Sequence, residues 1–223
     1  MIIKDWCQEL SCLPKSVWAA YAKSREPLTG RLTREEYENF FHAADLCGME
    51  LAQKTRRQWG DVSCGELAEK LGVRVERLPM PDGDGLLTFA IFEEPDLIRV
   101  YTDNADATRS LIETSGGNEF IGDVDICEML LAHELFHVLQ LKEPELYVNK
   151  KHIRLWKLGP WIRESRLPSL EEVAAMAFAR ELLQMPTTPY LYDVLMLLPQ
   201  ATEQAEKLYH NLQLWKEEVS PCE

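Results

Sequence analysis

The spacing of apolar residues along the chain predicts a mainly helical protein. Apolar residues recur every three to four positions between residues 34 and 59, as in a helix with one buried face. The capping box Thr33-Arg-Glu-Glu36 marks the start of this helix, and a second one, Ser63-Cys-Gly-Glu66, opens a short helix that ends at Gly72. Similar patterns predict further helices at 106–115, 169–184, 188–198 and 201–218.

Between these helices the apolar period shortens to two residues, which is typical of strands. We expect strands at 73–78, 86–92 and 97–101, with turns rich in Gly, Pro and Asp at 81–85 and 93–96. Three short strands joined in this way predict a small, mostly antiparallel sheet.

Beyond residue 144 no clear period is present, and we expect a loop-rich connection up to residue 168. It mixes Tyr147, His152 and two tryptophans with basic residues. Such mixing is found at the mouth of a cleft and also in packed, irregular connections, and the pattern does not choose between them.

Composition narrows the classes of function. The net charge is −13, with 37 acidic against 24 basic residues, which disfavours binding to nucleic acid or to anionic membranes. No apolar run approaches the roughly 20 residues that span a bilayer, and the start lacks the layout of a signal peptide. The six cysteines are scattered, as is typical of reduced thiols. We therefore expect a cytoplasmic protein without a membrane segment.

The apolar run 126–141 contains the pattern His-Glu-Leu-Phe-His, with histidines at 133 and 137. No Gly or Pro interrupts it, so we expect a buried helix that begins near Asp123. Residues four apart on a helix share one face, so His133 and His137 can bind one Zn²⁺ ion and Glu134 can reach its water. The alternative is a metal-free core helix whose histidines have other partners.

A catalytic zinc ion usually has a third protein ligand from another element. The helix predicted at 169–184 offers Glu171 and Glu172 in its first turn, followed by small residues that allow close approach to another helix. Ser169 and Glu172 also form a capping-box pattern, which would explain a glutamate there without any metal. Helix geometry alone does not choose between the two glutamates.

Two motifs together resemble the ImmA/IrrE family of gluzincin-type metallopeptidases. The pattern at 133–137 is followed by the run 172–186, Glu-Val-Ala-Ala-Met-Ala-Phe-Ala-Arg-Glu-Leu-Leu-Gln-Met-Pro, which is similar to the family's E-x-x-A-N-x-F-A-x-x-L-L-M-P. The resemblance covers about 50–190. It departs from the family at Met176, where Asn is usual, and at Gln184, which adds one residue before Met-Pro.

Matched by motif position, the resemblance implies that His133, His137 and Glu172 hold zinc and that Glu134 is the general base. It also implies a specific protein substrate, such as a transcriptional repressor or an antitoxin-like protein. Members often carry a DNA-binding helix-turn-helix, but residues 1–60 do not look like one, and we expect no direct contact with nucleic acid.

We therefore expect an α+β protein with one predominantly helical domain, residues 1–223, and a small sheet packed beside the motif helix in a zincin-like fold. Residues 1–60 would form a helical N-terminal extension, 61–190 the catalytic core and 191–223 the C-terminal helices.

Several secondary roles follow from the same hypothesis. The outer strand, 97–101 or 86–92, would pair with an extended substrate, and Tyr147 or His152 could donate to the oxyanion. A rival hypothesis is a zinc-stabilised binding module without turnover, in which a side chain such as Cys127 fills the fourth metal position. A third is a metal-free helical scaffold.

Overall fold

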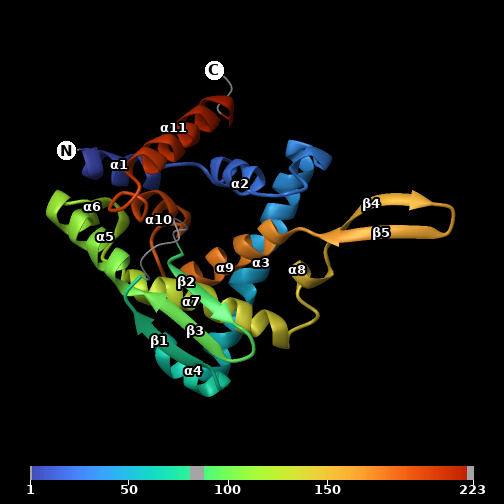
Figure 1. Ribbon diagram of the computed structural model, residues 1–223, viewed down its shortest axis with the longest axis horizontal. Helices are drawn as coiled ribbons and strands as arrows, with labels where there is room; N and C mark the ends of the chain where they lie inside the picture. Colours follow the sequence, from blue (N-terminus) through green and yellow to red (C-terminus); the bar gives the residue numbers. More distant parts are fainter. Residues whose placement is uncertain (1, 81–87, 220–223) are drawn as a thin grey trace.

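The computed structural model describes residues 2–80 and 88–219 and shows a mostly helical protein with two small sheets (Figure 1). The predicted turn at 81–85, the start of the strand predicted at 86–92, and Cys222 lie outside the described residues. The helices are α1 (Ile2–Ser11), α2 (Lys15–Ser24), α3 (Arg34–Trp59), α4 (Cys64–Leu71), α5 (Thr102–Ser115), α6 (Asn118–Ile121), α7 (Ile126–Lys142), α8 (Tyr147–Lys150), α9 (Pro168–Leu182), α10 (Tyr190–Leu195) and α11 (Thr202–Val219), with a 3₁₀ turn at Thr29–Arg31. Among these residues no helix is long and apolar enough to cross a membrane.

Both predicted capping boxes are present. The Thr33 hydroxyl accepts from the backbone N–H of Glu36 at 3.1 Å, and the Glu36 carboxylate accepts from the Thr33 N–H at 2.9 Å. Ser63 and Glu66 make the same reciprocal pair ahead of α4. Gly72 ends α4 in the left-handed conformation, with φ of 74°. Local sequence therefore determines where α3 and α4 begin and where α4 ends.

The first sheet contains β1 (Arg74–Leu78), β2 (Ala90–Glu93) and β3 (Leu97–Tyr101) in the order β1-β3-β2. The prediction of a mostly antiparallel sheet is wrong: β1 runs parallel to β3, and only β2 is antiparallel to it. The strand β3 lies at the centre and is the most buried of the three, with Ile98 and Val100 fully covered. Residues 97–101 therefore cannot be the outer strand, whereas β2 lies at an edge.

The expectation of a loop-rich connection after residue 144 is also wrong. The chain there forms α8 and then a hairpin of β4 (His152–Leu158) and β5 (Trp161–Arg166), which projects away from the rest of the molecule (Figure 1). Both faces of the hairpin are largely exposed, so no face selects apolar residues and the sequence shows no clear alternation.

Three helices form the centre of the molecule, where α9 packs against both α3 and α7. The crossing of α3 and α9 is very close, because a Cβ atom added to Gly48 would lie 2.0 Å from the carbonyl oxygen of Ala174. The rings of Phe136 on α7 and Phe178 on α9 pack with centroids 5.9 Å apart. One buried cluster extends from Trp6 to Leu212, so residues of the predicted N-terminal extension share a core with the motif helix.

The C-terminus of α9 shows how the helix ends at Gln184, the residue that departs from the family pattern in the predicted resemblance. Gln184 adopts the left-handed conformation, with φ of 52°. The N–H of Met185 donates to the Arg180 carbonyl at 2.9 Å, and the N–H of Gln184 donates to the Glu181 carbonyl at 3.3 Å. This is the hydrogen-bond pattern of a Schellman cap, so Gln184 ends the helix.

Candidate metal centre

The motif helix α7 begins at Ile126, slightly later than predicted. Its N-cap is Asp125, whose carboxylate accepts from the N–H of Glu128 at 3.1 Å. The helix is buried on most sides, as its apolar composition predicts. His133 and His137 lie one turn apart on the side that opens into a cleft. Core packing on the other sides of α7 therefore determines where the two imidazoles point.

The first turn of α9 brings Glu172 to this side of α7. Pro168 is the first residue of α9, so Ser169 lies inside the helix and not at its N-cap. The cap comes instead from Glu26, which is 2% exposed and accepts from the Ser169 N–H at 3.2 Å and from its hydroxyl at 2.6 Å. The predicted capping-box role of Glu172 is therefore wrong, and its carboxylate is directed at the histidines.

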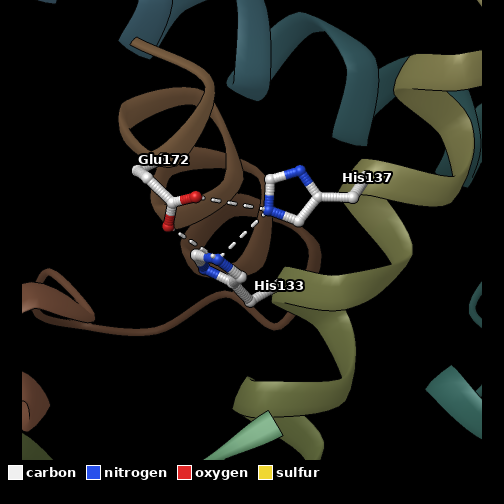
Figure 2. A group of neighbouring side chains, drawn as sticks. All are labelled: His133, His137 and Glu172. Atoms are coloured by element: carbon white, nitrogen blue, oxygen red, sulfur yellow. Dashed lines mark hydrogen bonds and ion pairs between the residues drawn. The ribbon is translucent and has the colours of Figure 1, made fainter. Parts of the chain in front are cut away.

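The three side chains predicted as ligands converge on one point (Figure 2). The two Nε2 atoms of His133 and His137 are 3.4 Å apart. Oε2 of Glu172 lies 3.3 Å from Nε2 of His133, and Oε1 of Glu172 lies 3.7 Å from Nε2 of His137. Ligands at about 2.0–2.1 Å from a tetrahedral zinc ion lie about 3.4 Å from one another. One ligand atom from each residue lies within 4.8 Å of the others, so the three groups are close enough together to hold one metal ion.

Glu171, the other candidate, points elsewhere. Its carboxylate pairs with Arg166 at the end of β5, at 3.5 Å. The structure thus separates the two adjacent glutamates, which helix geometry in the sequence could not do, and brings Glu172 to the histidines.

The charges of the site are strongly coupled. Burial alone would lower the pKa of His133 and raise the pKa of Glu172, but the hydrogen bond and the attraction between the two side chains outweigh it. The pKa of His133 rises to about 9 and the pKa of Glu172 falls to about 2. At neutral pH the metal-free site therefore holds a proton between them, and a metal ion must displace that proton to bind.

Next to the ligands is a polar pair that the sequence analysis missed. The Nδ1 atom of His137 lies 3.2 Å from Oε1 of Gln140, whose Nε2 donates to Oδ1 of Asn149 at 3.0 Å. The signal was available, since Gln140 is a polar residue in a mostly apolar part of the helix, three positions after the second histidine.

The site lies in an open cleft of about 460 Å³. Glu134 is almost completely buried in the wall of the cleft. Three residues of the edge strand β2, namely Ala90, Ile91 and Phe92, also line the cleft. The cleft therefore combines the three converging side chains, an adjacent carboxylate and a strand edge.

Three residues predicted for secondary roles lie elsewhere. Tyr147 lines a separate groove beside Cys47 on α3, and His152 is exposed at the start of β4, with its Nδ1 atom 2.8 Å from the Lys150 carbonyl. Neither is among the residues that line the cleft. Cys127 is in the first turn of α7 and does not belong to the group of possible ligands found among the described residues. The structure therefore provides no support for a sulfur ligand in the fourth position.

No protein-family model, no curated protein and no solved structure matches this chain. The resemblance to the ImmA/IrrE family stays a prediction that depends on the two motifs.

Proposed function

We propose that this protein is a zinc-dependent metallopeptidase of the ImmA/IrrE type with a zincin-like catalytic core. The observation that carries the proposal is the convergence of His133, His137 and Glu172 within 4.8 Å of one another, beside the buried Glu134. Two imidazoles and one carboxylate are the donor set of a catalytic zinc site, which leaves one position for water.

The chain's own residues have distinct roles in this proposal. His133, His137 and Glu172 would hold the ion. When bound, zinc acts as a Lewis acid and lowers the pKa of a coordinated water to about 7. Glu134 accepts the proton of the attacking water and delivers it to the leaving amine, as a general base and then a general acid. Its position in the cleft wall, next in sequence to His133, supports this role.

The substrate would bind as an extended segment along β2. Among the residues that the structure describes, this strand pairs with β3 alone, and it lines the cleft, so its outer edge is suited to β-augmentation. We propose that the segment belongs to a specific protein, such as a repressor or an antitoxin-like protein, in the cytoplasm. The family resemblance supports this choice, and the net charge of −13 supports a protein substrate over nucleic acid or membrane.

Two measurements test the proposal. Protein purified without chelator should contain about one zinc ion per chain by mass spectrometry, and the His133→Ala variant should contain none. The metal-loaded protein should cleave a quenched-fluorescence peptide library, and Glu134→Gln should abolish cleavage while keeping the metal. The control is Glu128→Gln, which changes a glutamate on the same helix that pairs with Arg77.

Each outcome has a clear meaning. Normal cleavage by the Glu134→Gln variant would refute the mechanism. Stoichiometric zinc without cleavage of the library or of any candidate repressor would favour the silent binding module, and no bound metal at all would favour the metal-free scaffold.

A further inference from the structure

The C-terminus of α7 is capped by a side chain from α8. The amide nitrogen of Asn149, Nδ2, donates to the backbone carbonyls of Gln140 and Glu143 at 2.9 and 3.0 Å. Carbonyl oxygens at the end of a helix can only accept hydrogen bonds. The orientation of the Asn149 amide is therefore determined: its NH₂ group faces the helix end, and its oxygen faces away.

This orientation determines the next one. Because Oδ1 of Asn149 can only accept, the Gln140 side chain must present its Nε2 to it, at 3.0 Å. The other end of the same amide, Oε1, then lies 3.2 Å from Nδ1 of His137. An amide oxygen cannot donate, so the proton of this contact must be on Nδ1 of the imidazole.

We propose that Gln140 and Asn149 are positioning residues that keep the proton of His137 on Nδ1 and leave the lone pair of Nε2 facing the metal position. A neutral imidazole carries one proton, and the nitrogen that binds a metal must be without it. The carbonyl groups at the end of α7 thus determine the orientation of the Asn149 amide. That amide determines the orientation of the Gln140 amide, which in turn determines which nitrogen of His137 is protonated. Gln140 is 6% exposed, so few water molecules can compete for the contact.

The inference rests on the metal site of the proposed function but not on peptidase activity. Its test is the zinc affinity, measured by competition with a chelating dye. Gln140→Met keeps the length of the side chain and removes the acceptor, so zinc should bind about 10- to 100-fold more weakly. Gln140→Glu keeps an acceptor for the Nδ1 proton but loses the donor to Asn149, so its zinc affinity should stay well above that of Gln140→Met. Gln53→Met, on the exposed side of α3, is the matched control and should have no effect.

A second measurement shows directly which ring nitrogen of His137 carries the proton. Long-range ¹H–¹⁵N spectra of the zinc-loaded protein should show His137 protonated at Nδ1, and spectra of the metal-free protein at pH 8 should show the same form. In metal-free Gln140→Met a second population with the proton on Nε2 should appear. The measurement on the unchanged protein needs no variant, so it decides the matter even if Gln140→Met fails to fold.

The possible failures are distinguishable. A protein that binds no zinc would overturn the proposed function. A protein that binds zinc, but with His137 protonated at Nε2 when metal-free or with the same affinity after Gln140→Met, would overturn only the roles of Gln140 and Asn149.

Discussion

The two helices that carry the candidate ligands differ sharply in their surroundings from the hairpin that lies between them in the chain. The helices α7 and α9 are buried on most sides. The hairpin β4–β5 exposes large apolar side chains near its tip, with Leu158 at 74% and Trp161 at 72%. Neighbouring segments of the chain are thus stabilised by different interactions. The metal centre depends on core packing, whereas the hairpin depends mainly on its own ladder of hydrogen bonds.

The charges of the two regions also differ. Residues 152–166 contain four basic residues and one acidic residue, a net charge of +3, in a chain whose total is −13. One contact between the hairpin and the body is the hydrogen bond from Arg31 to the carbonyl of Leu155, at 2.8 Å. Changes near the tip of the hairpin should therefore leave the candidate metal centre intact, and changes in the helices α7 and α9 should not.

The largest expected effect is the loss of a ligand. Glu172→Gln should weaken zinc binding by more than about 100-fold, beyond the effect typical of an outer partner. The neighbouring change Glu171→Gln should have little effect, because that carboxylate pairs with Arg166. Chelator competition measures both. Equal losses in the two variants would show that the choice of Glu172 is wrong.

The next effect concerns the packing that holds α9 in place. Gly48→Ala puts a methyl group against the backbone of Ala174, which cannot move away by changing a rotamer. We expect a loss of about 3 kcal/mol in the free energy of unfolding, at the upper end for overpacking, together with weaker zinc binding. Urea denaturation measures the first. The control is Gly65→Ala in α4, where an added Cβ meets nothing within 4 Å and stability should be unchanged or slightly higher.

A smaller effect should appear as a dependence of stability on pH. The pKa of His133 is about 9 in the folded metal-free protein, against an ordinary value of 6.5. The stabilisation that this raised pKa of His133 gives to the folded protein is therefore complete below pH 6.5. It is lost as the pH rises through 9. Melting curves with chelator present should show a loss from pH 6 to pH 10 that His133→Gln lacks. With zinc bound, the ion replaces the shared proton, and the loss should be reduced.

The smallest effect is expected in the hairpin. Trp161→Ser should change the free energy of unfolding by less than about 0.5 kcal/mol, because the side chain is mostly exposed, and zinc affinity should stay the same. A large loss of either would show that the hairpin supports the metal centre and would remove the contrast between the two regions.

Local sequence determined the parts of the site that depend on one helix. The spacing of His133 and His137 places both rings on one face of α7, and Thr33 and Ser63 cap their helices where predicted. The choice of Glu172 over Glu171 was different, since it depends on how α9 is rotated against α7. That rotation comes from tertiary packing, which no local pattern contains.

The predictions that were wrong also concern features that local sequence patterns do not determine. Ser169 and Glu172 satisfy a capping pattern, but Pro168 starts the helix one residue earlier and Glu26 supplies the cap from a distant part of the chain. The order of strands in the first sheet follows burial and not sequence order. The hairpin β4–β5 was missed because neither of its faces is buried, so it has no apolar period.

The carboxylate of Glu26 has a practical consequence for anyone who shortens this protein. A version that starts at residue 61, as the motifs alone would suggest, would lose the acceptor that covers the amino end of α9 as well as the helix crossing at Gly48. The first sixty residues therefore support the position of Glu172, and a shortened protein should lose metal affinity before it loses its motif helix.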